Sequence, residues 1–388
     1  MRKKILFLLD GPYPNLNAGG ALVDKIIRYH GINNFSIIGL RESLLDSEFP
    51  VEYDKIKIKT VALRFPKNSK LFKVMRKFPL IETIFIQFRI FTRLNDIISF
   101  ARDQKSEILF TILRGDALLV INKVKTALNI PLVAFDTDTV ESEFNDHYLI
   151  YWQKKNAFYK ALLCVSSLAT IGESMHDLYF TKFNIDSIIL RLPLKRSKQR
   201  SLKIINRKIN IIFLGNIYAK KELTSFIKAL DVFLSQEREF TINFYIATHK
   251  PINTRCNLLN CVNLGWMPTE ELSTYLEECH IAYLPYKFDL KFKHQMKYAF
   301  PNKSGQYINN NIPIFFHGPS YSSFNKFLER FLVGVSCDSI VEKDIIRKFQ
   351  ILIDNKEFYK KNQNECVRAY KNEFSEEVFE ERINRLFV

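Results

Sequence analysis

The segment Ile209-Asn-Ile-Ile-Phe-Leu-Gly-Asn-Ile-Tyr-Ala-Lys-Lys221 decides the fold. It begins with a short, mainly apolar run, which is typical of a parallel strand buried on both faces. Gly215 then begins a turn, and the pattern predicts a helix over residues 221–234. A strand that leads through a glycine turn into a helix is the repeating unit of doubly wound α/β domains.

The same alternation continues on both sides of this segment. It predicts two Rossmann-like domains, each built on a doubly wound parallel sheet, because 388 residues exceed one ordinary core. Further strands are predicted over 5–9, 35–40, 56–63, 108–112, 132–135, 169–171, 187–192, 240–247, 262–264, 281–284 and 312–316. Further helices are predicted over 21–30, 173–179, 269–278, 303–309 and from about 341 onward.

The domain boundaries follow from a change in charge. Residues 195–208 hold seven Lys/Arg and no acid, which predicts a solvated connector. We therefore expect a first domain over 1–200 and a second over 201–372. Residues 373–388 are expected to form a C-terminal helix that packs back on the first domain.

Composition limits the partners and the compartment. The formal net charge of +16 argues for an anionic partner, whether nucleic acid, a membrane surface or a phosphorylated ligand. The six cysteines show no zinc spacing and suggest free thiols in a reducing compartment. The apolar run 5–9 is too short for a signal peptide, and no run of 18 apolar residues occurs. We expect a cytoplasmic protein, or a peripheral one.

Ligands of open α/β sheets bind beyond the carboxyl ends of the strands, and two loops there contain glycine. Gly19-Gly20 opens the first helix, where the backbone and the helix N-terminus suit an anion. The alternative is a turn without a ligand. Gly215 and Asn216 precede a helix start with Lys221, which suits a diphosphate; the alternative is an ordinary surface lysine.

Two further loops carry candidate ligand-binding residues. Trp266 follows Gly265 at the rim of the sheet, where a nucleobase can stack; the alternative is a turn before a capped helix. Lys303 lies in the first turn of the helix that begins after Pro301. A cation is unfavourable at the positive end of a helix, and phosphate binding would explain it.

In this order and spacing, the loops resemble the retaining GT-B glycosyltransferases with the E-x(7)-E signature, which are family 4-like and belong to group 1. The chain departs from the family pattern at three positions. Tyr298 and Gln306 stand where the signature has its two glutamates, and Asn216 stands where the family often has an arginine. An amide still hydrogen-bonds to hydroxyls, so Gln306 can preserve ribose binding. The matching segments are Gly19-Gly20, Gly215 with Lys221, Val262–Gly265, Glu270–Leu272, Ala282–Pro285, Phe300–Tyr307 and Ile312–Ile314.

The resemblance implies two domains that face each other across a cleft and a hexosyltransferase-like transfer from a nucleotide sugar, with retention and without a metal or other cofactor. Lys221 and Lys303 would neutralise the leaving diphosphate. Asp136 or Asp138 would orient the acceptor hydroxyl or accept its proton, unless they form only a polar loop. The donor would be bound by Gly19, Gly20, Gly215, Asn216, Trp266, Pro301, Asn302, Ser304 and Gln306.

Residues 64–95 suggest where the acceptor comes from. They hold eight Lys/Arg, six Phe and one acid, a composition that suits an anionic membrane surface. The acceptor would then be a glycan or lipid-linked, as in bacterial cell-surface polysaccharide synthesis (lipopolysaccharide or capsule), at the inner face of the cytoplasmic membrane. The alternative is an ordinary helix pair with aromatic core faces and lysine outside.

Two other classes of function remain open at this stage. A catalytically silent GT-B scaffold is compatible with the loss of both signature glutamates. A basic nucleic-acid-binding protein is compatible with the charge and the aromatic residues, although the sequence shows no nucleic-acid-binding module.

Overall fold

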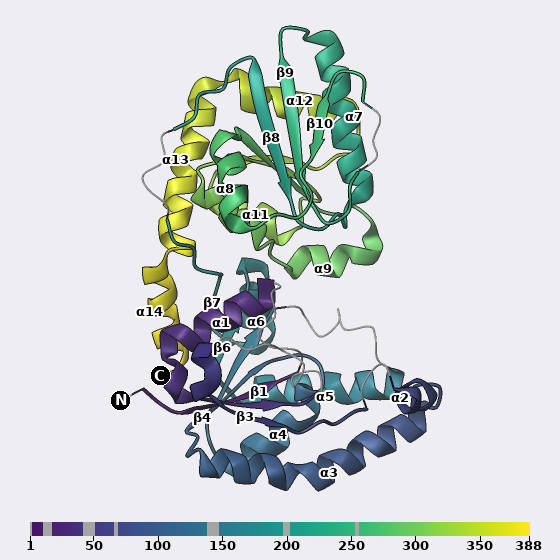
Figure 1. The fold of residues 1–388 in the computed structure, drawn as a ribbon, viewed down its shortest axis with the longest axis vertical. Coiled ribbons are helices and arrows are strands. Elements are labelled where there is room, and N and C mark those ends of the chain that lie inside the picture. Colours follow the sequence, from purple (N-terminus) through teal and green to yellow (C-terminus); the bar gives the residue numbers. More distant parts are fainter. Residues whose placement is uncertain are drawn as a thin grey trace. The chain divides into compact units, whose positions relative to one another are not determined.

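The computed structural model describes residues 2–10, 18–41, 51–65, 69–137, 147–196, 202–252 and 256–388. The chain divides into two compact units (Figure 1). Unit 1 comprises Met1–Leu192 with Phe379–Val388, and unit 2 comprises Pro193–Val378. The predicted boundaries lay after residues 200 and 372, so they fall eight residues late and six residues early.

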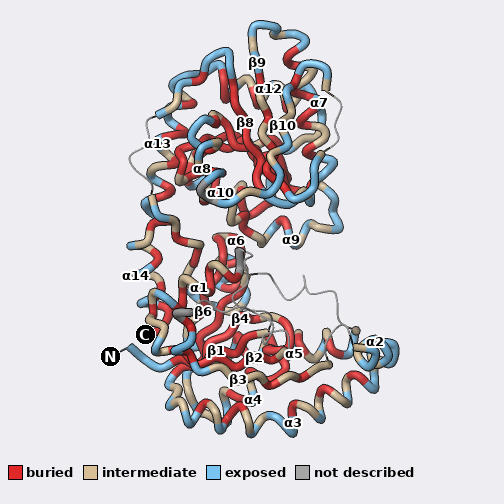
Figure 2. Tube along the Cα trace, in the orientation of Figure 1, coloured by how far each residue is buried: buried red, intermediate tan, exposed pale blue. Residues whose placement is uncertain are grey.

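Unit 1 contains a seven-stranded parallel sheet in the order β3-β2-β1-β4-β5-β6-β7. Every residue of β1, β2, β4 and β5 is buried, which explains their continuous apolar runs (Figure 2). Only Ile188 and Ile189 of the predicted strand 187–192 pair with β6, because β7 lies at the sheet edge. The strands are β1 Ile5–Leu9, β2 Phe35–Gly39, β3 Lys57–Thr60, β4 Ile108–Ile112, β5 Leu132–Asp136, β6 Val165–Thr170 and β7 Ile188–Ile189.

The helices of unit 1 follow the strands in alternation. The first of them begins at Ala18, so Gly19 and Gly20 lie inside its first turn. The helices are α1 Ala18–His30, α2 Lys70–Met75, α3 Pro79–Asp103, α4 Ala117–Leu128, α5 Tyr148–Cys164 and α6 Glu173–Phe183. Single 3-10 turns occupy Ile32–Asn34 and Val51–Lys55.

Unit 2 contains a six-stranded parallel sheet in the order β10-β9-β8-β11-β12-β13. Its core is rich in aromatic rings, with Phe226 of α7 stacked on Tyr283 of β11 at a centroid distance of 4.0 Å. The strands are β8 Lys208–Leu214, β9 Thr241–Ala247, β10 Asn260–Asn263, β11 Ile281–Pro285, β12 Ile314–His317 and β13 Gly334–Cys337. The helices are α7 Lys220–Gln236, α8 Thr269–Glu278, α9 Lys293–Tyr298, α10 Lys303–Asn309, α11 Ser323–Arg330, α12 Glu342–Asp354 and α13 Lys356–Glu373, with a 3-10 turn at Leu290–Phe292.

The last helix, α14 Glu376–Leu386, brings the C-terminus into unit 1. Phe387 lies against His30 and Phe110, with ring centroids 4.9 and 5.4 Å apart. None of the six cysteines, all of which the structure describes, forms a disulfide. Across the described ranges, no helix is both long and apolar enough to cross a membrane.

Candidate functional site

The site in unit 2 begins where the strand order reverses, between β8 and β11. Parallel sheets bind ligands beyond the carboxyl ends of the strands at this kind of position. Gly215 follows β8 with a φ of +92°, a backbone conformation that suits glycine. The Tyr218 hydroxyl donates to the carbonyl of Pro285 at 2.7 Å and thereby ties the loop after β8 to the end of β11.

Lys303 reaches this loop from α10. Its Nζ donates to the carbonyl of Leu214 at 2.9 Å and lies 4.3 Å from the ring centroid of Phe213. A Cβ on Gly215 would lie 4.0 Å from the same Nζ. Two loops that the sequence predicted separately, 89 residues apart, therefore converge on one point.

The surroundings of Lys303 set its chemistry. The side chain is largely withdrawn from water, and burial lowers its pKa to about 7. Among the described residues, the ammonium has one hydrogen-bond partner, the Leu214 carbonyl at 2.9 Å, and it lies beside an apolar ring, so it still has unused donors. A diphosphate oxygen would use those donors and favour the charged form.

Tyr307 fixes the same loop from one helical turn further along α10. Its hydroxyl accepts from the backbone N–H of Leu214 at 2.9 Å. Lys303 and Tyr307 therefore hold both polar groups of Leu214, directly before Gly215. These two hydrogen bonds therefore hold the start of the loop after β8 in place without a ligand.

The neighbouring predicted site residues differ in their burial and hydrogen bonding. Ser304 is fully buried and donates to the carbonyl of Pro301 at 2.7 Å, which ties it to the helix start. Gln306 is half-buried, and its amide has no hydrogen bond with any other residue that the structure describes. Asn302 precedes α10 without a capping bond from its side chain, and Asn216 is exposed next to Gly215.

Trp266 follows the carboxyl end of the neighbouring strand β10. It is 67% exposed and stacks on His249, with centroids 6.0 Å apart and ring planes 12° apart. Gly265 before it has a φ of +73°, which turns the chain sharply after β10. His249 was not among the predicted site residues, although its position shortly after the strand that ends at Ala247 was a signal in the sequence.

Lys221 lies at the start of α7. It is the second residue of α7 and is exposed. It lines a hollow of about 590 Å³ with Lys220, Lys228 and Glu342. Its role at a diphosphate stays a prediction.

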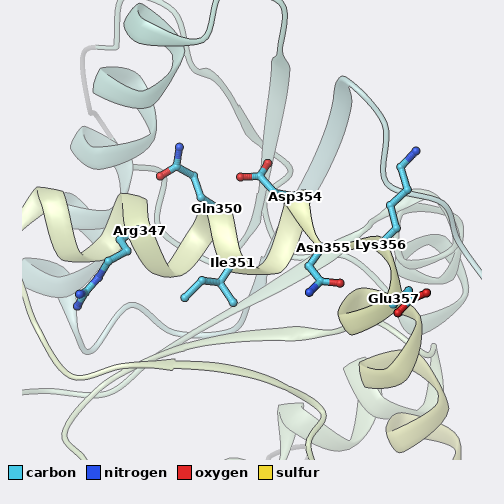
Figure 3. Close-up of a pocket in the computed structure, with 7 residues that line it drawn as sticks. All are labelled: Arg347, Gln350, Ile351, Asp354, Asn355, Lys356 and Glu357. Atoms are coloured by element: carbon cyan, nitrogen blue, oxygen red, sulfur yellow. The ribbon is translucent and has the colours of Figure 1, made fainter.

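A second hollow, of about 760 Å³, lies where α12 meets α13 (Figure 3). Arg347, Asp354 and Lys356 are among its lining residues, and it contains none of the predicted site residues. Figure 3 shows the side chains spread along the two helices rather than converging. We assign this hollow no chemistry.

The strand order of unit 1 also reverses, between β1 and β4, and buried charged groups gather at that position. The carboxylate of Asp10 pairs with Arg41 and accepts the N–H of Asp116 at 2.6 Å. A Cβ on Gly115 would lie 1.4 Å from Oδ2 of Asp10, so only glycine leaves room. Burial and the nearby carboxylate of Asp116 raise the pKa of Asp10.

Asp116 connects this pair to two helices. Arg64 donates to it at 2.8 Å and also to Glu82 of α3 at 3.0 Å, while Lys154 of α5 lies 3.1 Å from it. Burial alone would raise the pKa of Asp116, but Lys154, Arg64 and Arg41 hold it at about 2. The sequence did not indicate a site at any of these residues, because charged residues scattered over the chain show no spacing motif.

The remaining predicted residues lie in unit 1. Asp136 ends β5, is buried and accepts a hydrogen bond from the hydroxyl of Tyr179, which favours a structural role. Asp138 lies outside the described residues. Gly19 and Gly20 contribute backbone N–H groups to the first turn of α1. In the parts of the chain that the structure describes, no group of three or more His, Cys, Asp or Glu could hold a metal ion.

Comparisons with known proteins agree on the fold. The chain matches no protein family model and no curated protein sequence. Among solved structures, HepE of Anabaena in complex with UDP is similar at a TM-score of 0.65 and 11% identity, over 98% of each chain. A glycosyltransferase from Rickettsia africae has the same TM-score and identity, over 100% of this chain and 98% of its own.

A third similar structure carries the name of a different kind of enzyme. A protein from Listeria monocytogenes described as a UDP-N-acetylglucosamine 2-epimerase is similar at a TM-score of 0.55 and 9% identity, over 100% of this chain and 95% of its own. Function must therefore be argued from the site. The two parallel sheets, each with its helices, and these likenesses show that the chain has the GT-B fold.

Proposed function

We propose that this chain transfers a sugar from a nucleotide-sugar donor that binds at the carboxyl edge of the sheet in unit 2. The observation that carries the proposal is the ammonium of Lys303 beside Gly215, where the strand order reverses. The UDP in the similar structure of HepE supports a nucleotide ligand of this kind.

The edge of the sheet suits a nucleotide in its length as well as its chemistry. Trp266 and His249 follow β10 and β9, which lie two strands and one strand from β8. Neighbouring strands are about 5 Å apart, so the stacked rings and the Gly215 loop are separated by about one nucleotide. The base would stack on Trp266, and the diphosphate would reach Lys303.

Glycosyl transfer builds negative charge on the leaving diphosphate. Lys303 can neutralise that charge in a site that is already formed, where the interaction is stronger than in water. Gly215 allows the phosphate oxygens to approach the backbone. Gln306 would replace a glutamate as the hydrogen-bonding partner of the ribose hydroxyls.

The finer features of the reaction are part of the same proposal. The transfer would retain the anomeric configuration and need no metal, with Lys221 as a second cation near the phosphates. The acceptor would be a glycan or a lipid-linked sugar of a bacterial cell-surface polysaccharide. Analysis of the product's anomeric configuration, with and without EDTA, tests both chemical features.

A nucleotide-binding measurement is the first test. Thermal shifts with UDP-, GDP-, ADP- and CMP-sugars and their free nucleotides identify the nucleotide, because a ligand of the folded state raises the melting temperature. Lys303→Met should then weaken binding of that nucleotide about tenfold or more, since it removes a charge-assisted contact. Isothermal titration calorimetry measures this loss.

Tyr307→Phe is the matched control, because it removes the other hydrogen bond to Leu214 but keeps the ammonium. It should lower stability and leave nucleotide affinity nearly unchanged. Equal losses in both variants would assign Lys303 a purely structural role. Nucleotide-sugar binding without turnover would favour the silent scaffold, and binding to nucleic acid alone would favour the nucleic-acid-binding protein.

A further inference from the structure

Helices α2 and α3 and the start of α5 expose an unusual amount of apolar surface. Six large side chains define what we call the apolar ridge: Phe78, Leu80, Ile84, Phe88, Phe91 and Trp152. Each of them is between 42% and 80% exposed. Large contiguous apolar patches on a folded protein mark sites of interaction.

The pattern of α3 shows two separate apolar stripes, one buried and one exposed. Ile86, Ile90 and Ile97 are buried and form the stripe that packs on unit 1. Since each helical residue turns by about 100°, Ile84, Phe88 and Phe91 fall on the opposite side. The alternative of an ordinary helix pair with aromatic core faces does not describe this stripe, because a second apolar stripe faces outward.

Contacts between the helices place the start of α5 beside α2 and α3. His147, directly before α5, pairs with the carbonyl of Arg76 at the end of α2. Gln87 of α3 donates to Gln153 of α5 at 2.9 Å. The start of α5, with the exposed rings of Tyr148 and Trp152, therefore lies beside the end of α2 and the middle of α3.

Cations surround the ridge. Lys73 and Lys77 are exposed next to Phe78, and the guanidinium of Arg89 lies 5.3 Å from the ring centroid of Phe85. Glu82 is the single acid between residues 69 and 95, and it is buried against Arg64. Lys73 and Lys77 therefore add positive charge beside Phe78, while Arg93 further along α3 pairs with Asp96 at 3.2 Å.

We propose that the apolar ridge and its cations dock on an anionic lipid bilayer. The aromatic and aliphatic side chains would enter the boundary between headgroups and acyl chains, while the lysines contact lipid phosphates. The charge argues for an anionic bilayer rather than a second copy of this basic chain, whose ridge would bring like charges together. The inference extends the proposed function, because a bilayer is where a lipid-linked acceptor resides.

Co-sedimentation with lipid vesicles tests the proposal. The whole protein should bind vesicles of phosphatidylcholine with phosphatidylglycerol and bind pure phosphatidylcholine vesicles weakly. Added salt should release the protein from the anionic vesicles. The double variant Phe88→Ser/Phe91→Ser should bind at least about tenfold more weakly, because two inserted rings are lost. Lys73→Glu/Lys77→Glu should abolish the preference for the anionic vesicles.

The matched control is Ile204→Ser/Leu290→Ser, which removes two equally exposed apolar side chains from unit 2. It should bind vesicles like the unchanged protein. No binding by the unchanged protein, or an equal loss in the control, would overturn the proposal. A ridge variant that only turns a dimer into a monomer in analytical ultracentrifugation would instead assign the ridge to a second copy.

Nucleotide affinity without vesicles keeps the two proposals separate. The ridge variants should bind the nucleotide like the unchanged protein, since the ridge belongs to unit 1 and Lys303 to unit 2. Vesicle binding without nucleotide binding would retain the ridge proposal and reject the glycosyltransferase. Nucleotide binding without vesicle binding would have the opposite meaning.

Discussion

At the residue scale, Lys303 couples nucleotide binding to pH. Its pKa of about 7 leaves the lysine mostly neutral above that pH, whereas a bound diphosphate would favour the ammonium. Binding should therefore take up a proton, and affinity should fall up to about tenfold per pH unit between about pH 7.5 and about pH 9. The phosphates of the nucleotide are ionised throughout this range. Calorimetry in buffers of different ionisation enthalpy counts the proton.

Lys303→Met provides the comparison, because it has no group that titrates there. Its affinity should be low and independent of pH over the same range. A nucleotide affinity of the unchanged protein that does not vary with pH would show that Lys303 does not contact the phosphates of the ligand.

The sequence predicts the members of this site better than their contacts. Gly215 and Lys303 stand out in the sequence, as a glycine after a strand and a cation at a helix start. Their approach through the Leu214 carbonyl depends on how the chain returns after 89 residues, which no local pattern encodes. Asp10 and Asp116 could not be found in this way, because burial and pairing define them only in the folded sheet.

At the element scale, strands were easier to predict than the role of helix α3. Buried parallel strands such as β1 and β8 are apolar on both faces, so short apolar runs locate them directly. Helix α3 has two apolar stripes, and the sequence cannot tell which one packs on the neighbouring helices α4 and α5. That choice follows from the position of the other helices.

A pair of substitutions in α3 tests this assignment. Ile86→Ala removes side-chain atoms from a buried position and should lower the free energy of unfolding by about 2–4 kcal/mol. Ile84→Ala, on the exposed stripe, should change it by less than about 0.5 kcal/mol. Urea denaturation measures both, and equal effects would contradict the two-stripe arrangement.

At the scale of the whole molecule, the last ten residues tie the chain's end to its beginning, because Phe379–Val388 belong to unit 1. Phe387 packs against His30, Phe35 and Phe110, which come from α1, β2 and β4. Its truncation in Phe387→Ala should therefore destabilise unit 1 by about 3–5 kcal/mol, as for other buried aromatic side chains. Val388→Ala, at a position that is 88% exposed, is the control and should change stability by less than about 0.5 kcal/mol.

Native-state hydrogen exchange locates the loss within the chain. Amides of β1, β2 and β4 should exchange faster in Phe387→Ala, because opening of unit 1 becomes less costly. Amides of β8 and β9 should exchange as before, since Phe387 has its ring contacts in unit 1. Faster exchange in β8 and β9 as well would mean that the two units unfold together and that the C-terminal segment stabilises the whole chain rather than unit 1.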